Sequence, residues 1–231
     1  MRDSSIASDG DSNDYSGTTP TMVYASTQQQ MYLIDQATLV ESVVMPLCNN
    51  VAGFQISDFA ISSTGQIYVS DMASTAFHIA DASGTCTLVR TLAVRQYGLA
   101  FVPPGVLGPT EVLLGAGDDS NLYRINTATG TLQLIGPFGS QAGDLAWTGT
   151  QLLATSLINT SFHLGVVNTT TGAFSDLGDT TYGGLYGLVF ANGKLLAFSA
   201  TAGAIELDPL TGATVRRRMP TPAWYGASGS P

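Results

Sequence analysis

One repeated hairpin pattern constrains the fold of this chain more than any other feature. Three segments share it: a short apolar strand, an Asn or Asp, two variable residues, Thr-Gly, and a second strand of alternating character, at residues 122–136, 164–178 and 204–218. Asn or Asp ends a strand by bonding its side chain to the backbone two residues on, and Gly supplies the positive φ that turns the chain back. Each copy is therefore expected to form an antiparallel β-hairpin.

Two looser copies extend the pattern towards the N-terminus. The anchor residues are then spaced by 46, 45, 42 and 40 residues: Asp35, Asp81, Asn126, Asn168 and Asp208. Two further apolar strands lie between consecutive hairpins, for example at residues 97–103 and 110–116. Every unit thus contains four short strands bounded by turn residues, and no segment has a helical period.

A unit of four strands and about 40 to 45 residues is the period of a β-propeller blade. The first ordered unit begins at Thr21 but lacks an opening strand, whereas the last residues resemble one, because Tyr225-Gly226 matches Tyr97-Gly98 and Tyr186-Gly187. We therefore predict an all-β, five-bladed propeller of four-stranded antiparallel blades over residues 21–231, closed by the C-terminal strand completing the first blade. On its Asp/Asn-x-x-Thr-Gly hairpins the chain resembles the broad class of β-propeller repeat proteins, especially secreted bacterial ones, with no named subfamily.

The charge composition narrows the classes of partner. Only 11% of the residues are charged, against about 25% in typical soluble domains, and the net charge is −9. An acidic chain with a single lysine, Lys194, is unsuited to neutralising nucleic-acid phosphates. No apolar run is long enough to span a bilayer. Nucleic acid and a transmembrane segment are thus not expected.

The first 20 residues are polar and acidic, and we expect them to form a flexible tether. Together with the low charge, such a tether suits a secreted protein or one held at the cell envelope, extracellular or periplasmic, through a lipid or an envelope partner. The chain itself shows no targeting segment, which agrees with a mature form from which that segment has been cut.

The connections that leave the outermost strands, and those between second and third strands, share one face of a propeller. This face is expected to be rich in amide and aromatic groups, which suit neutral polar ligands such as sugars. The candidate ligand-binding residues are Tyr97, Tyr186, Tyr225, Trp224, Gln55, Gln96 and Gln141. For the three tyrosines, which recur at one repeat position, aromatic packing between neighbouring blades is the alternative interpretation.

Two aspartates replace the repeated inner-strand glycine. Asp58 and Asp144 stand where the other units have Gly98, Gly187 and Gly226. If both side chains reach the central channel, their carboxylates provide the oxygen ligands that Ca²⁺ prefers. Alternatively, each bonds to backbone amides of the adjacent blade.

No familiar catalytic constellation is present. The three glutamates, Glu41, Glu111 and Glu206, are predicted to lie in second to fourth strands, away from the channel, so they offer no pair of channel carboxylates of the kind glycosidases use. We therefore expect a secreted or surface-tethered propeller that recognises a glycan or a protein partner. A metal-dependent hydrolase or lactonase with its site in the channel and a structural module of an envelope assembly are the alternatives.

The two cysteines test the expected strand register. Cys48 falls at the end of an outermost strand and Cys86 at the start of the next one. If outermost strands run side by side, the two residues lie at opposite ends, too far apart for a disulfide. Cys48 and Cys86 are therefore predicted to be unpaired, although two cysteines in a secreted protein are ordinarily bonded.

Overall fold

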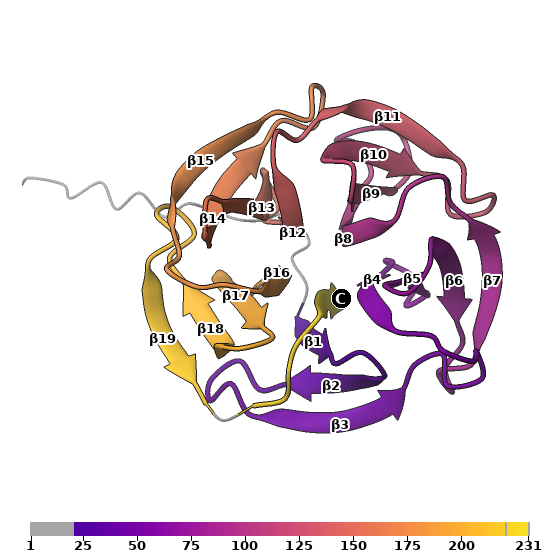
Figure 1. Ribbon diagram of the computed structural model, residues 1–231, viewed down its shortest axis with the longest axis horizontal. Coiled ribbons are helices and arrows are strands. Elements are labelled where there is room, and N and C mark those ends of the chain that lie inside the picture. The colour runs from indigo at the N-terminus through magenta and orange to yellow at the C-terminus, as the bar shows by residue number, and fades with distance from the viewer. Residues whose placement is uncertain (1–20, 220, 231) are drawn as a thin grey trace, which may run out of the picture.

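Five four-stranded antiparallel sheets stand around a central axis (Figure 1). The computed structural model describes residues 21–219 and 221–230, and the twenty strands in them confirm the predicted five-bladed β-propeller. The predicted tether at residues 1–20 lies outside the described residues. Within the described part of the chain, no helix is long and apolar enough to cross a membrane.

Each blade is named here from its inner to its outer strand. The first blade combines the two ends of the chain: β20 (Gly226–Ser230), β1 (Met22–Ser26), β2 (Gln30–Ile34) and β3 (Glu41–Pro46). The second contains β4 (Ile56–Ile61), β5 (Ile67–Asp71), β6 (Ala76–Ala80) and β7 (Cys86–Thr91). The third contains β8 (Gln96–Val102), β9 (Val112–Gly117), β10 (Asn121–Ile125) and β11 (Leu132–Pro137). The fourth contains β12 (Gln141–Trp147), β13 (Leu152–Ile158), β14 (Ser161–Val167) and β15 (Phe174–Asp179). The fifth contains β16 (Leu185–Ala191), β17 (Lys194–Ser199), β18 (Gly203–Leu207) and β19 (Thr214–Arg218).

The hairpins between third and fourth strands follow the chemistry predicted from the repeat. Asn126 Oδ1 accepts hydrogen bonds from the amides of Ala128 and Thr129, each 3.0 Å long. Gly130 then turns the chain with φ at 65°. The other anchors accept equivalent bonds, and they confirm the structural role predicted for this position: Asp35, Asp81, Asn168 and Asp208.

Apolar side chains fill the space between neighbouring blades. One buried cluster, for example, joins Leu153 and Leu164 of the fourth blade to Leu188, Leu195 and Ile205 of the fifth. Since both faces of an inner blade strand pack against neighbours, these strands read as nearly continuous apolar runs rather than alternating ones, and every residue of β4 is buried. This packing fixes the five inner strands around the axis.

The outermost strands lie along the circumference of the ring, each ending beside the next blade's hairpin (Figure 1). The twist between adjacent strands accumulates across four strands and turns the outer strand away from the axis. The end of β3 therefore meets the turn before β7: the Cys48 amide donates to the Gly84 carbonyl at 2.8 Å, and Cys48 and Cys86 form a disulfide with Cα atoms 4.7 Å apart. The prediction of unpaired cysteines is wrong, because it treated the outer strands as lying side by side.

The C-terminal strand closes the ring as predicted. β20 pairs with β1 along its length, from Met22 opposite Ser230 to Ser26 opposite Gly226. At the periphery of the ring, two arginines of β19 also connect the fifth blade to the first. Arg216, held by Glu206 at 2.5 Å, also donates to the carbonyls of the first blade's hairpin, while Arg218 pairs with Glu41 of β3.

Candidate binding site

Five residues, one from each inner strand, form a ring at the waist of the channel: Asp58, Gly98, Asp144, Gly187 and Gly226. Three are glycines, and the neighbouring backbones approach them closely. A Cβ on Gly98 would lie 2.8 Å from Asp144 Cα, and one on Gly226 would lie 2.9 Å from Asp58 Cα. The glycines leave the room that the two aspartate side chains occupy. The carboxyl groups of Asp58 and Asp144 come close enough to interact directly.

Each aspartate binds backbone amides of the next blade. Asp58 Oδ2 accepts from the Leu99 amide of β8 at 2.5 Å, and Asp144 Oδ2 accepts from the Leu188 amide of β16 at 2.5 Å. Asp144 Oδ1 also accepts from the Leu145 amide at 2.6 Å. An innermost strand has unpaired amides on its channel side, and these bonds satisfy three of them. The alternative predicted for these aspartates, bonding to backbone amides, is what the structure contains.

Burial and proximity raise the pKa values of both carboxyl groups. Both side chains are 0% exposed. Burial, and next the neighbouring Asp144 carboxyl, raise the pKa of Asp58 well above its usual value. Burial raises the pKa of Asp144 to about 8, although hydrogen bonds from Asp58 and from the backbone act in the other direction. At neutral pH the pair therefore holds a proton.

The predicted calcium site does not fit these contacts as they stand. Ca²⁺ takes six to eight oxygen ligands, whereas three of the four carboxyl oxygens here already accept backbone hydrogen bonds. Within the described residues, no group of three or more His, Cys, Asp and Glu side chains is placed to hold a metal ion. Calcium in the channel stays a prediction without a supporting donor set.

Of the aromatic residues predicted to bind a ligand, Trp224 is buried, and Tyr97, Tyr186 and Tyr225 are half-buried. The rings of Tyr186 and Tyr225 stack at 5.9 Å with an angle of 9°, and Tyr186 also meets Phe162 edge to face. Trp224 is 0% exposed. Its ring packs against Tyr32 and Phe198, so it joins the first and fifth blades. These contacts favour packing between blades, the alternative role of the repeated tyrosines.

The predicted glutamine and tyrosine positions are not equivalent in the structure. Gln55 and Gln141 are exposed, whereas Gln96 is fully buried and donates to the Val94 carbonyl at 2.9 Å. Tyr97 is half-buried. All of them lie near the start of an inner strand, on one face of the ring. Their role in ligand binding stays a prediction.

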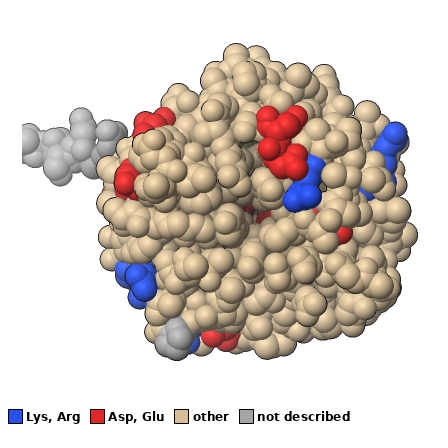
Figure 2. Space-filling model, in the orientation of Figure 1, with Lys and Arg blue, Asp and Glu red and all other residues tan. Residues whose placement is uncertain are grey.

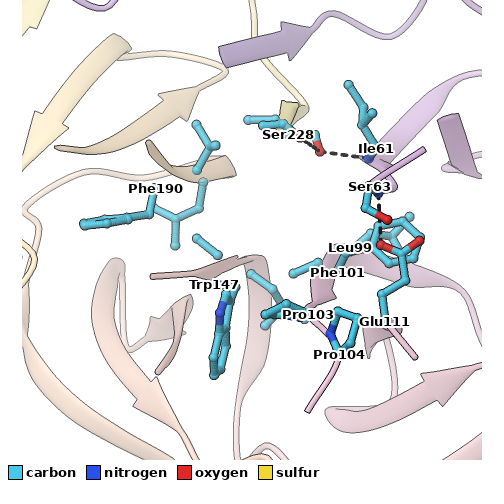
Figure 3. Close-up of a pocket in the computed structure, with 17 residues that line it drawn as sticks. Ile61, Ser63, Leu99, Phe101, Pro103, Pro104, Glu111, Trp147, Phe190 and Ser228 are labelled. Atoms are coloured by element: carbon cyan, nitrogen blue, oxygen red, sulfur yellow. Dashed lines mark hydrogen bonds between the residues drawn. The ribbon is translucent and has the colours of Figure 1, made fainter. Parts of the chain in front are cut away.

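A cavity of about 140 Å³ opens at the other end of the channel. It begins at Leu99, Leu145 and Leu188, whose amides bind the two carboxyl groups, and it extends to the C-terminal ends of the inner strands (Figure 3). Ala100, Ala146, Val189 and Ser228 are among its lining residues. In Figure 3 the rings of Phe190 and Trp147 point away from its centre.

Glu111 stands at the rim of this cavity, where the sequence analysis did not place it. It precedes β9, at the end of the loop of residues 103–111, and lines the cavity with Pro103 and Pro104 of the same loop. Glu111 Oε2 accepts a hydrogen bond from the Ser63 amide at 2.9 Å. The prediction that this glutamate lies away from the channel is therefore wrong. The Pro-Pro loop, longer than the corresponding connections of the other blades, was the signal available in the sequence.

Comparison with known proteins identifies the fold and no family. No family model matches the chain, and no curated protein matches it. Among solved structures, a chain of a nidogen/laminin complex is similar with a TM-score of 0.58 and 11% identity, over 92% of this chain and 84% of that one. A gluconolactonase from Xanthomonas campestris gives 0.56 and 13%, over 90% and 79%. A protein of unknown function from Bacteroides thetaiotaomicron gives 0.54 and 14%, over 77% and 53%. At these identities the likeness concerns the fold alone, and the five blades are established by the five four-stranded sheets of this chain.

Proposed function

We propose that this chain is a secreted binding propeller whose cavity at the channel mouth accepts part of a protein partner. One observation carries the proposal: the cavity is open to solvent and is lined mainly by apolar residues, with a single carboxylate among them. Its volume is close to the roughly 150 Å³ that accommodates one benzene-sized apolar group. A cavity of this size suits one side chain that anchors a larger interface.

The apolar walls favour a protein over a glycan as the occupant of this cavity. Sugars need several converging polar partners, whereas the side chains of Ser63, Glu111 and Ser228 are the polar ones among the lining residues. A glycan held by Gln55, Gln141 and Tyr97 on the other face is the competing arrangement, and the experiment below separates the two.

Hydrolysis in the channel is less well supported. A hydrolase would use Asp58 and Asp144, yet both are fully buried and neither lines the cavity. A general acid or base must come within hydrogen-bonding distance of the substrate. A structural module of an envelope assembly would also have to bind a protein partner. The partner-capture experiment below therefore tests this alternative together with the binding proposal.

Secretion is supported by the cysteines and by the surface. The Cys48–Cys86 disulfide joins the first two blades, and such bonds persist mainly in oxidising compartments. Figure 2 shows few charged side chains on one face of the ring, some of them grouped beside the hollow at its centre. Mass spectrometry of the protein isolated from its own organism tests this part. A 2-dalton deficit at the Cys48–Cys86 peptide pair is expected, and free thiols would contradict it.

The two faces can be tested with one substitution on each. Ser63 is exposed at the cavity rim, and Gln141 is exposed at the opposite face; neither side chain makes a hydrogen bond in the described structure. Partner capture from the organism's culture medium and cell surface should be lost with Ser63→Trp, which covers the cavity, and retained with Gln141→Trp. Loss with Gln141→Trp alone would move the site to the glutamine and tyrosine face.

A further inference from the structure

Glu111 has one carboxylate oxygen committed and one available. Oε2 accepts from the Ser63 amide, and Oε1 has no hydrogen-bond partner among the described residues. The Ser63 bond fixes the carboxylate at the rim, so that less side-chain freedom is lost when a ligand binds to it. A half-buried, oriented carboxylate with a free oxygen is a ready acceptor for a charge-assisted hydrogen bond.

Among the residues that the structure describes, no basic side chain forms an ion pair with this carboxylate. None of the cavity residues is Lys, Arg or His, and Glu111 is the one charged residue among them. The chain as a whole carries a net charge of −9. A field of this sign attracts cationic ligands and repels anionic ones. Among ligands whose apolar part fits the cavity, the negative charge therefore favours those that also carry a cationic group.

The position of the charge sets the order of groups in the ligand. Below the rim the lining residues are apolar: Leu99, Ala100, Leu145, Ala146 and Val189. A cationic group placed there would lose its hydration without gaining a partner. The apolar part of a ligand must therefore enter first, and its cationic group must stop at the rim.

We propose that the protein partner inserts an aliphatic side chain into the cavity and places an adjacent Arg or Lys on Glu111 Oε1. This inference rests on the proposed function and specifies its partner as a basic segment with an apolar plug. An arginine suits the site best, because its planar fork can reach Oε1 while its stem covers the prolines at the rim.

Four capped dipeptides test the inference with the intact protein: acetyl-Arg-Leu-amide, acetyl-Gln-Leu-amide, acetyl-Glu-Leu-amide and acetyl-Arg-Ser-amide. Their affinities are measured by titration calorimetry in low salt. The Arg-Leu peptide should bind about fivefold more tightly than Gln-Leu, which corresponds to about 1 kcal/mol for a partly exposed ion pair. Arg-Ser should bind more weakly again, because it lacks the plug, and Glu-Leu should not bind.

Glu111→Gln is the decisive variant, with Asp118→Asn as its matched control at an exposed acidic position. Glu111→Gln should make the Arg-Leu and Gln-Leu affinities equal, whereas Asp118→Asn should leave their ratio unchanged. Equal affinities of Arg-Leu and Gln-Leu for the unmodified protein would overturn the inference while leaving an apolar binding cavity. A partner captured by the unmodified protein but not by Ser63→Trp, with no dipeptide bound, would retain the proposed function and reject this ligand chemistry.

Discussion

The two buried aspartates differ in the replacement that they should tolerate. Asp58 has one oxygen that accepts from Leu99 and one, Oδ1, that has no donor within the described structure. Asp144 accepts backbone hydrogen bonds on both oxygens. An asparagine has one acceptor oxygen and one donor amide. Asp58→Asn therefore keeps its backbone bond and offers its NH₂ to Asp144, whereas Asp144→Asn turns an NH₂ group against a backbone N–H.

The magnitudes follow from these contacts. A buried donor left without a partner costs about 1–3 kcal/mol, and Asp144→Asn also loses the bond it replaces. We expect Asp144→Asn to lower the free energy of unfolding by about 2–4 kcal/mol at pH 7. Asp58→Asn should change the free energy of unfolding by less than about 1 kcal/mol.

The same pair gives stability a distinctive pH dependence. Both carboxyl groups have pKa values raised by folding, so between the unfolded value near 4 and the folded values, near 8 for Asp144, the folded state holds more protons than the unfolded state. The two carboxyl groups make their full contribution to the free energy of unfolding below pH 4. This contribution is lost as pH rises, by up to about 1.4 kcal/mol per pH unit for each retained proton. Asp58→Asn removes one of these protons and should become more stable than the unmodified protein as pH rises.

Urea unfolding followed by tryptophan fluorescence, at pH 5, 7 and 9, measures all of these differences. Other titrating groups, including His78, whose pKa burial lowers, act equally in all three proteins and cancel in the comparison. Equal losses in the two variants, or a larger loss for Asp58→Asn, would refute the assignment of donors and acceptors. A pH slope that Asp58→Asn leaves unchanged would refute the shared proton.

Two further predictions concern ring assembly. Replacing both cysteines by serine opens a loop of 38 residues and should cost up to about 4 kcal/mol, measured by thermal unfolding; an unchanged Tm would show that the disulfide adds no constraint. Gly98→Ala places a Cβ 2.8 Å from Asp144 Cα and should destabilise the ring by more than about 2 kcal/mol, whereas Gly108→Ala meets nothing within 4 Å and should be neutral; equal effects would contradict the close approach of the blades.

The local parts of the fold could be predicted from sequence because their chemistry is local. An anchor such as Asn126 and its Gly130 lie four residues apart, and their hydrogen bonds depend on no distant residue. Closure of the ring by β20 could also be predicted from the sequence, because Tyr225-Gly226 repeats an inner-strand pattern that the first unit lacks.

The remaining features depend on the twist of the blades and on loop paths. Cys48 meets Cys86 only because the outer strand turns along the circumference, which no repeat spacing reveals. Glu111 reaches the cavity through an irregular loop that departs from the repeat. The position of Asp58 and Asp144 was predictable, but the amides that they bind belong to neighbouring blades, at Leu99 and Leu188. These contacts depend on how neighbouring blades are positioned against each other, which the sequence repeat does not reveal.

The most direct test of the binding proposal is where a ligand binds. Amide chemical shifts of the ¹⁵N-labelled protein are followed by NMR as acetyl-Arg-Leu-amide is added. The account predicts shifts that cluster at the cavity, at Ser63, Ala100, Ala146 and Ser228. Shifts confined to Gln96, Tyr97, Gln141 and Tyr186 would place the site on the opposite face and contradict it.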